Sequence, residues 1–229
     1  MRVGSHARQF AVFAALIVAT CFCIATFTVR VIWTDELTHL WLIWNLFLAW
    51  LPMLCAIIAY NLAQTRVWLI WILVLPCMAC WLLFFPNAPY LVTDLIHIQP
   101  LDPVPLWYDL IMIATGAWIG FLLGVISLFF MQMLITERLG HIAGWLFVFC
   151  SIGLGSFGIY LGRFLRWNSW DILSNPTQLL IDIGSRVQAP LDHPRTIGFS
   201  LLFATFFLTI YLVIVAITYL PGSSRQTSP

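Results

Sequence analysis

Six long apolar stretches constrain the fold of this chain more than any other feature of its sequence. They lie near residues 10–32, 40–62, 67–85, 110–135, 142–165 and 197–220. Each is long enough to cross a bilayer as a helix, which takes roughly 20 residues. Only helices and closed barrels satisfy their backbone hydrogen bonds in lipid, and these runs lack the alternating pattern of barrel strands. We therefore predict an all-α polytopic membrane protein, with six transmembrane helices and short interfacial helices in a single domain, residues 1–229.

The composition supports this class and excludes several functions. Hydrophobic residues make up 62% of the chain and charged residues only 8%, whereas soluble domains carry about 25% charged residues. The net charge of +1 provides no basic surface, so we predict membrane lipid as a partner and no nucleic acid. Dinucleotide, phosphate-loop and zinc-protease motifs are absent, so we predict no cofactor and no metal. The six cysteines lie in apolar runs, where a thiol packs as a small hydrophobe.

The distribution of charge predicts the orientation of the chain in the membrane. With the N-terminus inside, the arginines divide equally between inner loops (Arg2, Arg8, Arg66, Arg138, Arg225) and outer loops (Arg30, Arg163, Arg166, Arg186, Arg195). Eight of the nine acidic residues fall on the outer side and can pair with its arginines, while the inner side holds only Glu137. We therefore predict cytoplasmic termini and extracytoplasmic polar segments at residues 86–109 and 163–196.

Prolines and polar residues mark three places in the chain: the second stretch, the end of the third stretch, and the loop that follows the fifth. Residues 85–90 place two prolines around Asn87, which predicts the end of the third helix. A short interfacial or re-entrant helix follows, with Asp94 and His97 on one side of a turn. Asn45 in the second stretch is a buried amide that needs a partner on another helix or a ligand. After Asn175-Pro176, an apolar stripe predicts an amphipathic helix lying on the membrane.

Glycines recur on one face of the fourth and of the fifth predicted helix. The positions are Gly116, Gly120 and Gly124 on the fourth helix and Gly155, Gly158 and Gly162 on the fifth. Small residues at this spacing allow helices to approach closely in lipid, so we expect the two faces to meet. Asp109 extends the first stripe and Arg166 the second, provided that the fifth helix continues to Arg166. The pattern therefore predicts an ion pair between Asp109 and Arg166, or failing that Arg163.

Polar residues concentrated on the outer face define a candidate site. The candidate ligand-binding residues are Asn45, Asn87, Asp109, Arg163, Arg166, Asn168 and Asp171. Arginine presents a planar fork that suits phosphate, and neighbouring tryptophans can flank a headgroup or a sugar. The first interpretation is therefore a site that binds or moves a lipid or a lipid-linked anion.

Two other interpretations of the same residues stay open. Asp94 and His97 form a candidate catalytic pair, as an acid and a base or as metal ligands, because a carboxylate and an imidazole can transfer protons. Charged residues also pair for purely structural reasons, so the network could hold the outer rim together in a scaffold. The residue types alone do not choose between binding, catalysis and structure.

Four stretches carry a family resemblance. They are residues 44–52 (WNLFLAWLP), 85–97 (FPNAPYLVTDLIH), 107–109 (WYD) and 162–171 (GRFLRWNSWD). Together they resemble the bacterial membrane family known as domain of unknown function 1361, from about the second helix to the sixth. The resemblance implies an integral bacterial membrane protein and brings no catalytic residues with it. We predict that this protein lies in the inner (plasma) membrane.

Overall fold

The computed structural model describes residues 2–65 and 67–218 of the chain. Arg66, Arg225 and the last two residues of the sixth predicted stretch lie outside the described residues, as do the side chains of Arg2 and Arg8. The elements in chain order are α1 (Arg2–Thr34), α2 (Leu40–Ala63), η1 (Trp68–Ile70), α3 (Trp71–Phe84), α4 (Asn87–Tyr90), η2 (Leu91–His97), α5 (Leu106–Leu139), α6 (His141–Leu165), α7 (Asp171–Ser174), α8 (Pro176–Gln188), η3 (Pro190–Asp192) and α9 (Pro194–Thr218).

Six helical stretches are long and apolar enough to cross a membrane. They are Phe10–Thr34, Leu40–Ala63, Trp68–His97, Leu106–Leu139, His141–Leu165 and Pro194–Thr218. The described residues form no β-strand, so the prediction of an all-α polytopic membrane protein is confirmed. The helix α5 is central: 61% of its most apolar 18 residues are buried, against 17% for α1.

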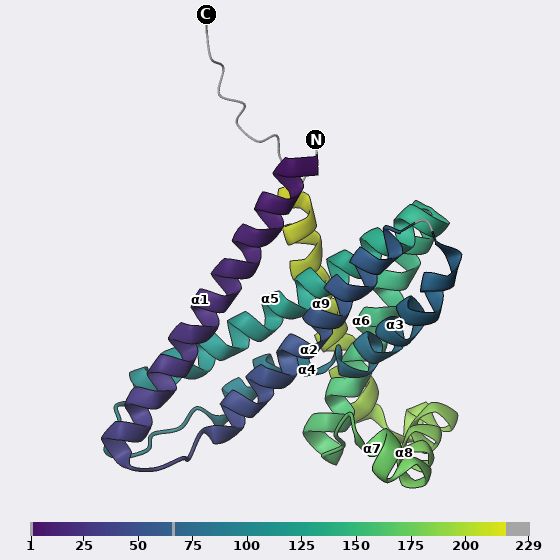
Figure 1. Ribbon diagram of the computed structural model, residues 1–229. Coiled ribbons are helices and arrows are strands. Elements are labelled where there is room, and N and C mark those ends of the chain that lie inside the picture. Colours follow the sequence, from purple (N-terminus) through teal and green to yellow (C-terminus); the bar gives the residue numbers. More distant parts are fainter. Residues whose placement is uncertain (1, 66, 219–229) are drawn as a thin grey trace, which may run out of the picture.

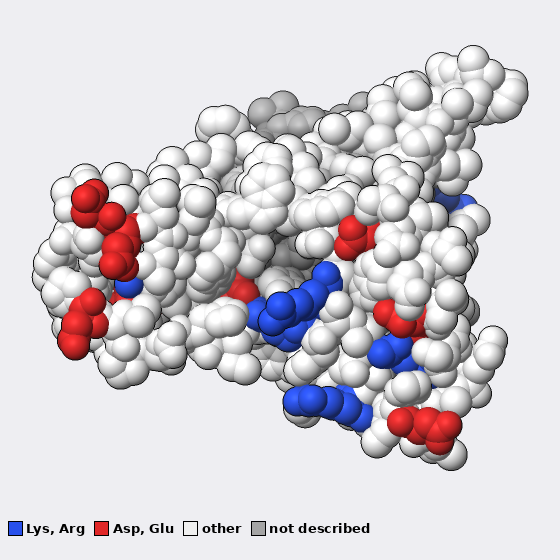
Figure 2. Space-filling view, turned by 90° about the horizontal axis from the view of Figure 1, so that it is seen from below, with Lys and Arg blue, Asp and Glu red and all other residues white. Residues whose placement is uncertain are grey.

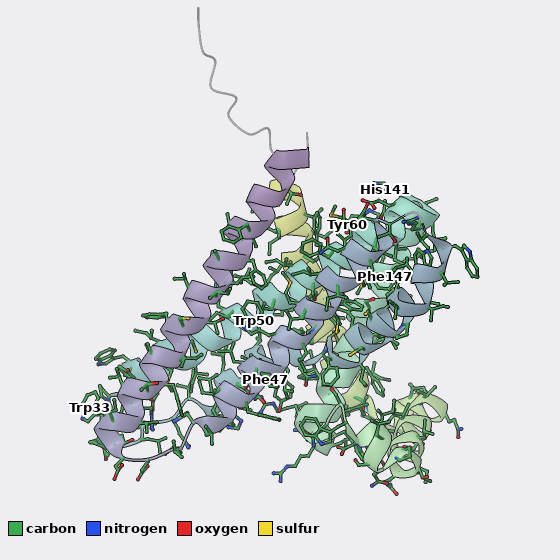
Figure 3. The ribbon with its side chains drawn as sticks, viewed as in Figure 1. Trp33, Phe47, Trp50, Tyr60, His141 and Phe147 are labelled. Atoms are coloured by element: carbon green, nitrogen blue, oxygen red, sulfur yellow. The ribbon has the colours of Figure 1, made fainter. Side chains whose placement is uncertain are left out.

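The loops lie in two groups, one at each end of the helix bundle (Figure 1). The α1–α2 loop, the η2–α5 loop and the α7–α8 segment lie at the lower end, which we call the polar end. Trp33 marks this end of α1, whereas Tyr60 and His141 lie at the opposite end (Figure 3). Alternate spans run in opposite directions, so residues near the start of α2 and near the end of α6 lie at the same end.

The third span is a broken helix. We expected the helix to end at Phe85, and α3 does end at Phe84, but helical backbone resumes at Asn87 and continues through α4 and η2 to His97. The first residues after the break are more buried than an interfacial helix would be, since Leu91 is inaccessible and Asp94 only 1% exposed, whereas residues 95–97 are exposed. Neighbouring helices cover this irregular backbone, as lipid requires of a broken span.

The glycine faces of α5 and α6 do not pack against each other. A side chain at Gly120 of α5 would meet the carbonyl oxygen of Ala88 at 2.6 Å, and one at Gly158 of α6 would meet the ring of Pro86 at 2.8 Å. The break segment, residues 85–91, therefore lies against both faces, and the prediction that they meet is wrong. Small residues permit close approach but do not specify which segment approaches. The other contacts are Gly116 with Leu42, Gly124 with Pro89, Gly155 with Phe85 and Gly162 with Tyr90.

Replacing Gly120 with alanine should destabilise the fold by about 1–3 kcal/mol, because the added carbon must displace backbone in a packed interior. The matched control is Gly153→Ala in α6, where an added carbon meets no described atom within 4 Å. That change should be neutral or stabilise the helix by up to about 1 kcal/mol. Unfolding in graded detergent mixtures measures both variants. Equal stabilities would contradict the close approach of α5 and the break segment.

Candidate functional site

A polar cluster centred on Arg163 joins α6 to the outer half of the broken span. The Arg163 guanidinium donates hydrogen bonds to Thr93 Oγ1 from Nε at 2.9 Å and from Nη2 at 2.6 Å. Its Nη2 also forms an ion pair with Asp94, and its Nη1 lies 2.9 Å from His97 Nε2. The guanidinium carbon lies 4.4 Å from the centroid of the Tyr90 ring. Together with Asn45, these residues are called the Arg163 cluster.

The buried carboxylate of Asp94 has two partners in this cluster. Asn45 on α2 donates a hydrogen bond from Nδ2 to Asp94 Oδ2 at 3.0 Å, and Arg163 approaches the other oxygen. Asn45 therefore makes an inter-helix contact of the kind that a buried amide needs. Arginine has no acceptor, so Nε2 of His97 is the acceptor in the contact with Arg163 Nη1. The candidates Asn45, Asp94, His97 and Arg163 are thus brought together.

Asp109 pairs with Arg30 of α1 and not with Arg166. Asp109 Oδ1 lies 2.7 Å from Arg30 Nε, Oδ2 lies 3.3 Å from Arg30 Nη2, and the two side chains are 1% and 2% exposed. The predicted pair of Asp109 with Arg166 or Arg163 is therefore wrong. One reason is that α6 ends at Leu165 and Arg166 adopts a left-handed conformation (φ 61°), which takes it off the glycine face.

Arg30 was not identified from the sequence as a candidate site residue. We assigned it to the outer loop, whereas it lies inside α1 and is almost completely buried. The sequence does indicate that Arg30 needs a partner, because a charge at membrane depth is costly unless paired. Asp109 is a candidate for that partner, since it lies at the start of an apolar helix. The sequence does not indicate which helix lies next to α1.

A cavity of about 690 Å³ lies between α2, the broken span, α6 and the α7–α8 segment. Its walls are mostly apolar. They include Trp44 and Leu48 of α2, Leu82 and Leu83 of α3, Leu154 and Phe157 of α6, Ile172 of α7, and Leu179 and Ile183 of α8. Its polar lining comes from Asn45, Asn87, Tyr90, Arg166, Trp167, Asn168 and Ser169. Figure 2, which looks onto the polar end, shows arginine side chains next to a hollow in this face.

The lining residues give the cavity an apolar interior and a polar end. Along α6 they run from Leu154 to Gly162, a length of about 12 Å at the helical rise of 1.5 Å per residue. The chain then leaves the helix and supplies residues 166–169 at the polar end. Arg166 is exposed, and its guanidinium forms no hydrogen bond or ion pair with any described residue.

The remaining candidate residues shape the loop that follows α6. Asn87 donates a hydrogen bond to Ser169 Oγ at 2.9 Å, and Ser169 donates to the carbonyl of Leu83 at 3.1 Å. These bonds tie the loop to the break in the third span. Asp171 accepts hydrogen bonds within its own turn, from the backbone N–H of Asn168 at 2.7 Å and from Ser174. The Asn168 N–H holds the pKa of Asp171 below its usual value, and the side chain does not line the cavity.

Among the described side chains, no group of three or more His, Cys, Asp or Glu residues is arranged to hold a metal ion. Of the predicted ligand-binding residues, Asn45, Asn87, Arg166 and Asn168 line the cavity. Asp109, Arg163 and Asp171 do not. The site therefore has two parts. One is the cavity, whose cation, Arg166, is unpaired among the described residues. The other is the Arg163 cluster of paired charges, which lies behind the cavity wall formed by Tyr90 and Asn45.

The fold and the site define a polytopic helical membrane protein whose broken third span borders both a buried polar cluster and a cavity. The chain belongs to the DUF1361 family of proteins of unknown function, whose family model matches residues 44–210. The match covers every residue of the cavity and of the Arg163 cluster, but not Arg30. It confirms the resemblance predicted from the four sequence stretches. No curated protein and no solved structure matches the chain.

Proposed function

We propose that this protein binds an anionic amphiphile, a membrane lipid or a lipid-linked anion, in the cavity beside Arg166. One observation carries the proposal: a cavity of about 690 Å³ with apolar walls contains a single arginine, whose guanidinium has no partner among the described residues. Pockets for small molecules have volumes of roughly 300–1,000 Å³ and combine apolar walls with a few polar groups. A ligand with an acyl chain and a charged head matches both parts.

The positions of the polar groups fit the two ends of such a ligand. The guanidinium of Arg166 can donate two parallel hydrogen bonds to a phosphate or a carboxylate. The amide of Asn87 already donates to Phe84 and Ser169, so Asn168 adds the second polar contact, and Trp44 and Trp167 provide aromatic surface. The apolar walls along α6 suit a hydrocarbon chain. The ligand would then lie with its head at the polar end and its chain towards the membrane interior.

The Arg163 cluster supports the wall of this cavity. Arg163 is occupied by Thr93, Asp94 and His97, so it is less available to a ligand than Arg166. It holds Tyr90 by stacking on its ring and Asn45 through the shared carboxylate of Asp94. Tyr90 and Asn45 both line the cavity. We therefore assign Arg163 a positioning role.

Catalysis by Asp94 and His97 remains the alternative, and it has less support. Neither residue lines the cavity, and the carboxylate of Asp94 already has two partners. A purely structural role fits the Arg163 cluster and the Arg30–Asp109 pair, but it leaves the unpaired Arg166 without an explanation. Binding is the function that accounts for Arg166.

We place the polar end outside the cytoplasm of a bacterium and the termini inside. This proposal rests on the distribution of charge, because an outer face that contains eight of the nine acidic residues can pair its arginines. In this orientation the cavity is open to lipids of the outer leaflet of the inner membrane.

The proposal predicts that Arg166→Gln lowers the retention of anionic lipid by about tenfold or more, the effect of losing one or two charge-assisted hydrogen bonds. Native mass spectrometry of the purified protein, after incubation with equal amounts of phosphatidylglycerol and phosphatidylcholine, measures retention. The matched control is Arg195→Gln, since Arg195 is exposed at the start of α9 and does not line the cavity. Equal retention of the anionic lipid by both variants would overturn the proposal.

A further inference from the structure

The amphipathic helix α8 lacks a protein partner for much of its apolar surface. None of its 13 residues is fully buried. Its principal backbone contacts are with its chain neighbours α7 and η3. Isolated helices shorter than about 12–15 residues are marginally stable in water, so a further surface must stabilise α8.

An apolar stripe on α8 is divided between two environments, and exposed Ile181 lies apart from it. Leu179, Leu180, Ile183 and Val187 fall within about 100° of arc at 3.6 residues per turn. Leu179 and Ile183 line the cavity. Leu180 and Val187 are 66% and 67% exposed. One half of the stripe therefore faces the candidate ligand, and the other half faces outward.

The position of α8 in the chain identifies what covers the outward half. The helix is tethered on one side to the end of α6 and on the other, through residues 189–193, to the start of α9. Both α6 and α9 are apolar enough to span a membrane, so their ends lie where the spans leave the hydrocarbon. Figure 1 shows α7 and α8 beside these ends. Exposed Leu173 of α7 and Leu191 of η3 extend the apolar surface, which makes the lipid interface the fitting occupant.

We propose that α8 is a movable wall that rests on the lipid interface and admits the amphiphile to the cavity sideways from the bilayer. The inference rests on the proposed function and specifies the source of the ligand as the membrane, not the aqueous phase. Among the described side chains, one hydrogen bond ties α8 to the loop after α6: Trp167 Nε1 donates to Asp182 Oδ2 at 2.9 Å. Because both Trp167 and the α8 residues Leu179 and Ile183 line the cavity, breaking this bond would open its wall.

Photo-crosslinking tests the placement of α8. Benzoylphenylalanine at Leu180 or Val187 should form adducts with phospholipid in vesicles of phosphatidylglycerol and phosphatidylethanolamine. The same residue at Gln178 or Ser185, which are exposed on the opposite face, is the matched control and should form far fewer. Equal yields at all four positions would overturn the placement of α8, whatever lipid the cavity retains.

Two substitutions of Asp182 test the gate. Asp182→Ala removes the acceptor for Trp167, whereas Asp182→Asn keeps an acceptor oxygen and removes only the charge. We expect exchange of a fluorescent anionic lipid to be about two- to tenfold faster in Asp182→Ala than in Asp182→Asn, the factor for one neutral hydrogen bond. Equilibrium retention should stay unchanged. Equal exchange rates in the two variants would overturn the gate, and adducts at Leu180 without any retained amphiphile would overturn both the gate and the proposed function.

Discussion

Replacing Asp109 with alanine should lower the free energy of unfolding by about 3–5 kcal/mol, because it leaves the buried charge of Arg30 without a partner. The two side chains are 1% and 2% exposed, so water cannot compensate either charge. The double change Arg30→Met with Asp109→Leu should recover most of the loss. Apolar residues of similar volume often replace a buried ion pair at no cost or with a gain in stability.

Unfolding of the purified protein in graded detergent mixtures measures this double-mutant cycle. The control is Arg186→Met in α8, whose Nη1 lies 3.9 Å from the carboxylate of Asp182, a carboxylate that is 28% exposed. That change should cost at most about 1 kcal/mol. If the double variant were as unstable as Asp109→Ala alone, Arg30 would not be the partner of Asp109.

The second large effect is expected at Arg163. Arg163→Ala should destabilise the protein by about 3 kcal/mol, since it leaves the buried carboxylate of Asp94 with Asn45 as its remaining partner. The value lies at the low end for buried pairs because the Arg163 side chain is 13% exposed. Arg163→Lys should be intermediate, because lysine keeps the charge but cannot reproduce the planar fork that reaches Thr93, Asp94 and His97.

Thermal unfolding followed by tryptophan fluorescence measures these variants. Adding Asp94→Asn to Arg163→Ala should restore part of the stability, because the substitution removes the uncompensated charge but keeps a polar partner for Asn45. Arg195→Ala is the control: Arg195 lies over the Phe164 ring, 5.0 Å from its centroid, on an exposed surface. No recovery in the double variant would mean that the ion pair is not what Arg163 supplies.

The membrane-spanning architecture is predictable from the sequence because apolar length alone decides it. The break in the third span is predictable from Pro86 and Pro89. The position of Asp94 and His97 on one side of a turn follows from helical spacing, and the need of Asn45 for a partner on another helix follows from its burial in lipid. These predictions depend on local chemistry, which a few consecutive residues encode.

Two predictions about the site were wrong because they depend on which segments are neighbours in space. Local sequence patterns do not encode which segments these are. The glycines of α5 and α6 indicate close approach, but the segment that approaches them is the break segment and not the opposite helix. Arg166 itself adopts a left-handed conformation at the end of α6 and so leaves the face of that helix. Because the residue is not a glycine, the sequence does not mark this position. Asp109 consequently pairs with Arg30 of α1, and Arg166 is left free to line the cavity.

The most direct test of the proposed function is electron cryomicroscopy of the protein in nanodiscs that contain phosphatidylglycerol, with a bound antibody fragment to aid alignment. We predict elongated density in the cavity, with its headgroup within hydrogen-bonding distance of the Arg166 guanidinium and its chain along α6. The same map of Arg166→Gln should lose the headgroup density. An empty cavity in the wild-type protein, or lipid headgroups bound elsewhere and unaffected by the substitution, would contradict the proposal.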